Sequence, residues 1–410
     1  MDNTDLIKKL PELLMGKELE EALQILPEYD EDIVEENAAI RLTSLENMYK
    51  VFVVNNMSKE IYVKLYLALL HSLQKKIGQV AIVQLNENAK AIREKEYSSI
   101  LGGADAFTII APSGCGKSSC VSRAVDLIMQ KQMIEIEEPY MKIIPYVIVQ
   151  CPWDSSVKGL MYEILRVIDV HLGTSYYTKA LRAQSTLESA IGTVAQVSLQ
   201  TIGVIIVDEI QNVVNSKNGK NLISSLTRLI NSSGVSIIMV GTPECRVFFE
   251  QAFQLARRSL GLYYDTMEYG NEFKRFCETM FQYQYVKNRT DLNEGIIQWL
   301  YEHSQGNLSI IASLLHDSQE LAIMNGKEVL NIETLDEAYR KRLSLLHSFV
   351  TPKKKKSTER LRSEKLFPVE VEENEEDIVL ISTLIQRAKN ECRDVVAFLS
   401  DFIPIERVSL

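Results

Sequence analysis

Residues 111–118, APSGCGKS, have the composition and spacing of a loop that binds phosphate groups. Gly114 and Gly116 let the backbone turn so that its N–H groups point at an anion. Lys117 would reach the β- and γ-phosphates of a nucleotide, and the Ser118 hydroxyl would be a ligand of Mg²⁺. These residues predict that the chain binds a nucleoside triphosphate together with Mg²⁺.

The residues on either side of this loop predict the elements that the motif requires. A hydrophobic run, AFTII at 106–110, predicts a strand, and apolar residues at helical spacing from Val121 to Ile128 predict a helix. That helix would add the partial positive charge of its N-terminus. Ala111 replaces the usual first glycine, so we expect the chain to approach the turn at a slightly different angle. The predicted nucleotide contacts are Ala111, Pro112, Ser113, Gly114, Cys115, Gly116, Lys117, Ser118 and Ser119.

A buried strand further along the chain, in GVIIVDEIQNV at 203–213, ends in two carboxylates. A short, continuous apolar run suits a central parallel strand. We expect Asp208 to hold the Mg²⁺ through water and Glu209 to polarise the attacking water. Buried strands often end in acidic residues, so this assignment depends on the loop at 111–118.

The last predicted strand, VSIIMVGTP at 235–243, ends near Thr242, whose hydroxyl would orient the same water. Glu209 and Thr242 are therefore candidate catalytic residues of an ATPase, and Ser118 and Asp208 are candidate Mg²⁺ ligands. The sequence lacks the Asn-Lys-x-Asp pattern that reads guanine. The predicted nucleotide is therefore ATP.

Composition narrows the class of protein. With 410 residues, 46% hydrophobic and 24% charged, the chain is of ordinary globular composition and has room for about two or three domains. No apolar run approaches the ~20 residues that span a bilayer, and MDNTDLIKKL lacks the form of a signal peptide. Six cysteines without a Cys-x-x-Cys pair suit reduced thiols, so we expect a cytoplasmic protein without membrane contact. The net charge of −10 argues against nucleic-acid binding over the whole surface but allows a local basic stripe.

The order of predicted elements is strand, loop, helix, strand, two helices, strand, helix, strand, then helices only. It predicts the α/β class, with a parallel sheet covered by helices on both faces and a small helical lid. That is the arrangement of the AAA+ branch of phosphate-loop ATPases. We expect a helix at 58–74 and a linker at 135–141. The predicted parts are an acidic segment 1–40, a nucleotide-binding domain with N-terminal helices 41–267, a lid 268–350, and a charged linker with an amphipathic helix 351–410.

Two arginines stand where a neighbouring subunit's active site would need one. AAA+ sites usually lie between subunits, and an arginine from a neighbour then stabilises the γ-phosphate. Arg257 and Arg258 end the helix that follows Thr242, although cations are also favoured at any helix C-terminus. In SQGNLSII, at 304–311, Leu308 stands where a lid arginine would be usual. Slow, regulatory hydrolysis would fit that gap.

With these residues in view, the chain resembles transposition regulators of the TnsC type, which are kin to the phage ATPase MuB. The matching stretches are APSGCGKSS, CPWDSSVKGL, GVIIVDEIQNV, SIIMVGTPECR with FEQAFQLARRSLG, and SQGNLSIIASLL, within about 40–350. The resemblance implies an ATPase that forms rings or filaments of its own copies around duplex DNA. It also implies two protein partners, a TniQ- or TnsD-type target selector and a transposase.

The resemblance places possible DNA contacts at Lys158, in CPWDSSVKGL, and at Lys179 and Arg182, in the inserted helical region. Such side chains would contact phosphates without reading sequence. A solvated helix face would carry the same residue types.

Two other functions remain open. A helicase loader or replication initiator would share the core but should carry a winged-helix domain after the lid, for which 351–410 is too short. A signalling NTPase switch that does not act on DNA would be favoured by internal repeats, and none is visible. The apolar stripe within 378–400 would either fold back on the lid or bind a partner.

Overall fold

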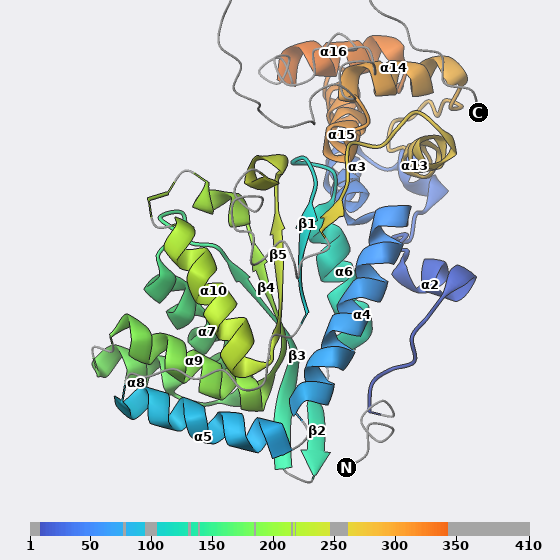
Figure 1. Ribbon diagram of the computed structural model, residues 1–410. Helices are drawn as coiled ribbons and strands as arrows, with labels where there is room; N and C mark the ends of the chain where they lie inside the picture. The colour runs from blue at the N-terminus through green and yellow to red at the C-terminus, as the bar shows by residue number, and fades with distance from the viewer. Residues whose placement is uncertain are drawn as a thin grey trace, which may run out of the picture. The chain divides into compact units, whose positions relative to one another are not determined.

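The computed structural model describes most of the first 342 residues (Figure 1). The described ranges are 9–76, 79–94, 105–129, 133–137, 140–183, 186–214, 216–217, 219–246 and 261–342. Arg257, Arg258 and the whole of 351–410 lie outside them, and so do the predictions made for those residues.

Six strands form one sheet in the order β2-β3-β4-β5-β1-β6. β2 pairs with β3 antiparallel, and the other neighbouring pairs are parallel. The predicted α/β fold is confirmed, and the four predicted strands correspond to β1, β3, β4 and β5. The strands are β1 Ala106–Ile110, β2 Ile134–Glu137, β3 Tyr140–Gln150, β4 Ile202–Asp208, β5 Ser236–Gly241 and β6 Leu262–Tyr263.

The predicted linker at 135–141 is wrong. Residues 135–137 lie in β2 and residues 140–141 begin β3, and the two strands pair from Ile134 with Ile143 to Glu137 with Tyr140. An edge strand with one exposed face tolerates a charged residue such as Glu135, so such a strand can resemble a linker in sequence. The sequence also gave no sign of β6, because its two residues are too few to show a period.

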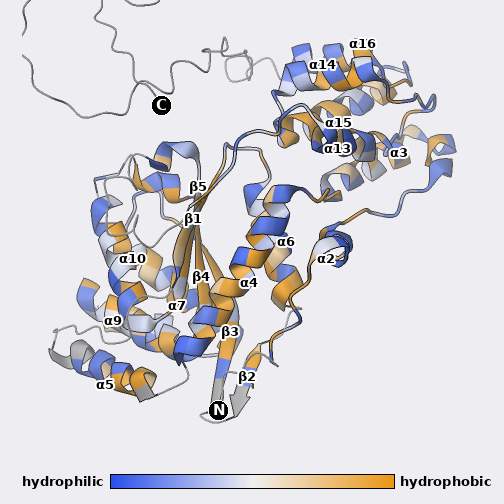
Figure 2. Cartoon of the chain, turned by 45° about the vertical axis from the view of Figure 1, so that its right-hand side comes forward, coloured by the Kyte–Doolittle hydropathy of each residue, from blue (hydrophilic) through white to orange (hydrophobic). Residues whose placement is uncertain are grey.

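Helices cover both faces of the sheet, and this explains why its central strands are almost wholly apolar. The central strands carry the hydrophobic colour in Figure 2. Ile205 and Val207 of β4 lie in one core and Val204 and Ile206 in the other, so alternate residues point to opposite sides of the sheet. The first core is closed by α7 Val157–Leu172, α9 Leu187–Thr201 and α10 Gly219–Ser233, and the second by α4 Asn56–Lys76 and α6 Lys117–Met129. Around them lie α2 Gly16–Leu23, α5 Gln79–Glu94 and α8 Tyr176–Arg182.

The helix predicted at 58–74 is confirmed as α4, which packs on α6 and the sheet. It begins two residues earlier than expected. The Asn55 side chain accepts a hydrogen bond from Ser58 N (2.9 Å), while the Ser58 hydroxyl oxygen accepts one from Asn55 N (3.0 Å). This reciprocal pair satisfies backbone donors that the helix itself leaves unpaired.

A separate helical core joins two distant parts of the chain. Leu45 and Met48 are buried among side chains of the C-terminal helices, such as Leu300 and Leu314. The first two come from α3 Ala38–Leu45 and the short helix Glu46–Lys50. The C-terminal helices are α13 Asn271–Phe281, α14 Glu294–Ser304, α15 Leu308–Met324 and α16 Ile332–Arg342.

All five described cysteines are buried and free. Burial raises the pKa of Cys115, within the phosphate loop, to about 11, so its thiol stays protonated near neutral pH and is a poor nucleophile. Among the residues described, every helix is too short or too polar to cross a membrane.

A buried ion pair fastens α3 to the C-terminal helices. The Arg41 guanidinium, 1% exposed, donates two hydrogen bonds of 2.7 Å to the Glu328 carboxylate and one of 2.9 Å to the carbonyl of Tyr285. The hydrogen bond from Arg41 lowers the pKa of Glu328 below its ordinary value. Removing Arg41 leaves the Glu328 carboxylate, which is 17% exposed, without its cation and largely shielded from water.

We expect Arg41→Met to lower the free energy of unfolding by about 3 kcal/mol or more, measured by urea denaturation. Because the folded pKa of Glu328 is lowered, the stabilisation is present above the unfolded pKa and is lost as pH falls through the folded pKa. Glu163→Gln is the control, since it breaks an exposed pair with Arg166 and should cost at most about 0.5 kcal/mol. Equal stability of the two variants would contradict the assignment.

Candidate nucleotide-binding site

The phosphate loop connects β1 to α6, as its motif requires. Gly114 and Gly116 have φ angles of +81° and +85°, in the left-handed region that glycine adopts without strain. Ala111 is not among the described residues with positive φ, and its N–H donates to the carbonyl of Gly241 at 3.2 Å. Ala111 therefore extends the pairing of β1 with β5, and alanine is accommodated there.

The acidic strand end meets the loop directly. The Ser118 hydroxyl donates to Asp208 Oδ2 at 3.0 Å, and the backbone N–H of Glu209 donates to Asp208 Oδ1 at 2.8 Å. Hydroxyl and carboxylate oxygens are ligands that Mg²⁺ prefers. The structure thus brings together the two side chains predicted as metal ligands, and their chemistry fits Mg²⁺.

Glu209 is held in a strained backbone conformation. Its φ angle is +55°, which is uncommon for a residue other than glycine, and such strain clusters at functional sites. The Gln211 side-chain amide donates to the Glu209 carboxylate. Gln211 Oε1 is buried and has no hydrogen-bond partner in the described part of the chain. The sequence analysis missed Gln211, although the string DEIQ holds it two residues from Glu209.

Thr242 lies at the end of β5, next to β1 and β4. It is 9% exposed, and its hydroxyl donates to the Glu244 carboxylate two residues further on. The Thr242 hydroxyl is therefore bound to a neighbouring side chain, and the prediction that it orients the attacking water stays a prediction.

A cavity of about 590 Å³ lies beside the loop, within the range of small-molecule sites. Residues 113–120 and Glu209 form its polar wall. An apolar wall comes from Val51, Val53, Phe276 and Leu308, which suits a flat purine base. Three parts of the chain thus enclose one cavity, and the loop and Glu209 were predicted as parts of the nucleotide site.

The helical domain also contacts the loop through hydrogen bonds. Asn307 Nδ2 donates to the carbonyl of Ser113 at 2.8 Å, and the N–H of Ser309 donates to the carbonyl of Gly114 at 3.0 Å. Asn307 Oδ1 meanwhile caps α15 by accepting from Ile310 N at 3.3 Å. A Cβ at Gly114 would lie 2.4 Å from Asn307 Oδ1, so glycine is required there for a second reason. Leu308, the residue in the position of the usual arginine, lines the cavity.

The three predicted DNA contacts lie on two neighbouring helices. Lys158 lies in the first turn of α7, whereas Lys179 and Arg182 are exposed on α8. α8 packs against α7, where the rings of Tyr162 and Tyr177 lie 6.0 Å apart. A different pair of lysines, Lys217 and Lys220, is exposed on the loop and first turn of α10. That loop lies beside the start of α7, because the Ser216 hydroxyl donates to the carbonyl of Asp154 at 2.8 Å.

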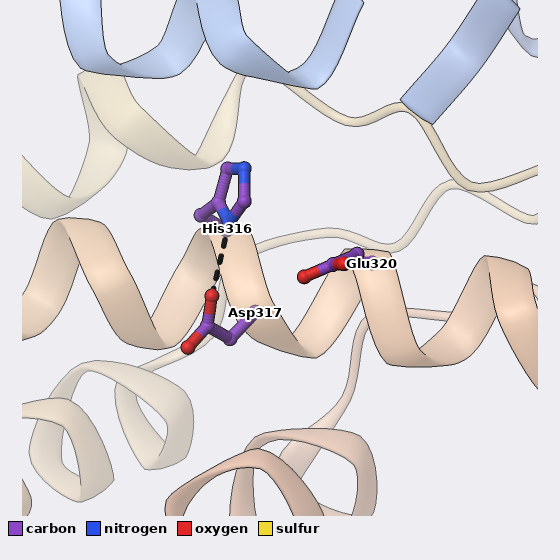
Figure 3. Close-up of side chains that lie close together, drawn as sticks. All are labelled: His316, Asp317 and Glu320. Carbon is purple, nitrogen blue, oxygen red and sulfur yellow. Dashed lines mark hydrogen bonds and ion pairs between the residues drawn. The ribbon is translucent and has the colours of Figure 1, made fainter. Parts of the chain in front are cut away.

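One other cluster of potential ligands lies on α15 (Figure 3). His316 Nδ1 lies 3.0 Å from Asp317 Oδ1, and Glu320 is close by. Arg342 makes ion pairs with both acidic residues. A fixed cation therefore already neutralises these carboxylates, and we interpret the cluster as an ion-pair network of the helical domain.

The fold and the gathered side chains define the α/β fold of phosphate-loop ATPases. Residues 101–249 match the family model of an AAA domain. The sequence matches none of the curated proteins with which it was compared.

Three solved structures illustrate the likeness in fold. The Aeropyrum pernix ORC1 protein in complex with DNA is 14% identical, with a TM-score of 0.42 over 65% of this chain and 66% of that one. Drosophila ORC bound to DNA is 13% identical, with a TM-score of 0.42 over 80% of this chain and 69% of that one. Domain III of the Thermotoga maritima replication initiation protein DnaA is 16% identical, with a TM-score of 0.34 over 67% of this chain and 95% of that one. The match spans slightly less than two thirds of the Aeropyrum chain, and such values concern the fold alone.

The contact between Asn307 and the loop predicts an effect on nucleotide affinity. Asn307→Asp keeps the helix cap but replaces the amide donor with a carboxylate that faces the Ser113 carbonyl, on the loop predicted to bind phosphate. We expect ATP affinity to fall about tenfold, the equivalent of one hydrogen bond and some repulsion, in a titration with a fluorescent ATP analogue. Asn293→Asp makes the same change at the cap of α14 and should have no effect. If both variants bind ATP equally, the contact plays no part in binding.

Proposed function

We propose that this chain is an ATPase that assembles with further copies of itself on duplex DNA and uses ATP hydrolysis as a timed switch. The observation that carries the proposal is that Ser118, which donates a hydrogen bond to Asp208, lines one cavity together with Lys117 and Glu209. This is the full set of groups that phosphoryl transfer to water needs from a single subunit.

Each group has a distinct task in the proposed reaction. The loop N–H groups and Lys117, which is only 7% exposed, would bind the phosphate chain. Ser118 and Asp208 would hold Mg²⁺, which neutralises charge on the β- and γ-phosphates. Glu209 would accept a proton from the attacking water. Gln211 donates to one oxygen of the Glu209 carboxylate, which orients the side chain and leaves the second oxygen to accept the proton.

The partners follow from the sequence and not from the site. Self-assembly would let an arginine of a neighbouring copy, Arg257 or Arg258, reach the γ-phosphate. Duplex DNA would lie against basic side chains, among them Lys158, or Lys179 with Arg182.

Two finer forms of this proposal differ in the protein that receives the signal. In the first, the chain is a replication initiator or helicase loader. In the second, suggested by the sequence resemblance, it is a TnsC-type regulator that links a TniQ- or TnsD-type selector to a transposase. The three solved structures named above are of replication-origin and initiation proteins. None of these three is a transposition regulator, and likeness in fold leaves both forms open.

Sequence preference separates the two forms. An initiator that recognises an origin should bind its site at least about 10³-fold more tightly than unrelated duplexes at physiological salt. A regulator of the TnsC type should bind duplexes of any sequence with similar affinity. Selection of bound duplexes from a random pool, followed by sequencing, measures this difference. A switch that does not act on DNA would bind no duplex in either nucleotide state.

We expect Glu209→Gln to bind ATP and Mg²⁺ normally but to hydrolyse ATP about 10²- to 10⁴-fold more slowly, because an amide cannot accept the proton of water. Assemblies formed with ATP should then persist on DNA, as seen by sedimentation. Lys117→Ala is the complementary variant, and it should lose ATP binding and ATP-stimulated DNA binding together. Faster disassembly of the Glu209 variant than of the wild type would refute the role of Glu209.

The separation of the basic residues makes DNA binding testable by salt titration. Each phosphate contact contributes roughly −0.9 to the slope of log affinity against log salt. We expect Lys158→Ala, Lys217→Ala and Lys220→Ala to flatten this slope by about one contact each, because these residues share one end of the sheet. The double variant Lys179→Ala/Arg182→Ala tests the alternative contact on α8. A flatter slope in the double variant alone would place DNA on α8 instead.

A further inference from the structure

Trp153 is left almost wholly in water. Its side chain is 86% exposed, in the loop between β3 and α7. Tryptophan is usually well buried, so an exposed one marks a surface that a partner covers. The loop follows the carboxyl end of β3, the same edge of the sheet that carries Asp208 and the phosphate loop.

The loop is built to hold Trp153 outward. Ser155 is fully buried at a φ angle of +50°, and its N–H donates to the carbonyl of Pro152 at 2.9 Å. The Ser156 N–H donates to Asp154 Oδ1 at 3.0 Å, and the Ser156 hydroxyl oxygen caps α7 by accepting from Gly159 N at 3.2 Å. A fixed loop with a two-torsion side chain loses little entropy on binding.

Further hydrogen bonds join this loop to the segment that carries Glu209. The N–H of Cys151 donates to the carbonyl of Asp208 at 2.8 Å. The Asn212 side-chain amide donates to the carbonyl of Cys151 at 2.8 Å, and the Ser155 hydroxyl donates to the carbonyl of Asn212 at 3.1 Å. The Asn212 N–H in turn donates to the carbonyl of Glu209 at 3.1 Å. These hydrogen bonds form a continuous set of contacts from the loop to the residue that would activate water.

The charges near Trp153 favour an anionic partner. Lys158 lies in the first turn of α7, above the Tyr162 ring at 5.5 Å. The exposed Lys217 and Lys220 belong to the neighbouring loop and helix start, next to Asp154. Asp154 is a negative charge in the same loop, and its Oδ1 accepts a hydrogen bond from the Ser156 N–H. A flat apolar ring with lysines on its own loop's following helix and on the neighbouring loop is complementary to nucleic acid, which has phosphates on its outside and flat bases within.

We propose that Trp153 is the apolar contact of this chain with duplex DNA, packing against the bases or sugars of one groove while Lys158, Lys217 and Lys220 contact phosphates. The contact is transmitted through Asn212 to Glu209, so that DNA stimulates ATP hydrolysis. This inference rests on the proposed function, because it requires that the chain binds DNA.

The sequence allows a direct measurement. The chain has two tryptophans, Trp153 and Trp299, so Trp299→Phe leaves Trp153 as the single fluorescent reporter. Phenylalanine keeps the aromatic stack that Trp299 makes with His303. We expect quenching of Trp153 by acrylamide to fall severalfold when duplex DNA is added with a non-hydrolysable ATP analogue. The anisotropy of a labelled duplex measures binding independently.

Variants test the contact and the coupling separately. Trp153→Ala should weaken duplex binding about 5- to 100-fold and leave ATP hydrolysis without DNA unchanged. Val170→Ala is the matched control, because it removes another highly exposed apolar side chain from the far end of α7. Asn212→Ala should still bind duplex but lose most of the stimulation of ATP hydrolysis by DNA.

Three results would overturn the inference, and each is distinguishable. If the labelled duplex binds while Trp153 stays open to acrylamide, the DNA contact lies elsewhere and the proposed function survives. If the ATP analogue alone shields Trp153, the loop is a contact between copies of the chain. If no duplex binds to the wild type, the proposed function and this inference both fail.

Discussion

The hydrogen bond from the Ser118 hydroxyl to the Asp208 carboxylate joins two residues 90 positions apart, and the site depends on the sheet register that makes it possible. Ile237 of β5 pairs with Ala106 of β1 on one side and with Ile205 of β4 on the other. β1 and β4, which lie on either side of β5, therefore end almost level, at Ile110 and Asp208. Parallel strands place their carboxyl ends at one edge, so the loop after β1 and the acid at the end of β4 meet there.

Gly241 connects the two halves of this edge. Its carbonyl accepts the hydrogen bond from Ala111, which starts the phosphate loop. A Cβ at Gly241 would lie 2.7 Å from Ile210 Cγ2 and 3.1 Å from Gln211 Oε1. The missing side chain thus leaves room for the short helix Ile210–Val213, which begins right after the strained Glu209. One small residue allows both the loop and the segment with Glu209 to approach the end of β5.

The sequence was most informative where a single short segment forms the predicted element by itself, without contacts to distant residues. APSGCGKS and the apolar run before Asp208 are such segments, and the predicted strands and α4 were found. The linker prediction at 135–141 failed because charge on an edge strand resembles charge in a loop. Leu45 and Met48 carry no sign of a core more than two hundred residues away. Likewise, Asn307 has the signal of a helix cap, but only the tertiary structure reveals its donor to Ser113.

The charges around the cavity indicate why a single subunit should hydrolyse ATP slowly. Three described cations line it, namely Lys50, Lys117 and Arg123. Lys50 donates to the Asn47 side chain at 2.8 Å, and Arg123 donates to the carbonyls of Ala22 and Leu23 at the end of α2. The helical domain contributes the neutral Asn307 and the partial charge of a helix N-terminus. The charge that develops on the γ-phosphate therefore needs a further cation from outside this set, which favours hydrolysis within an assembly of several copies.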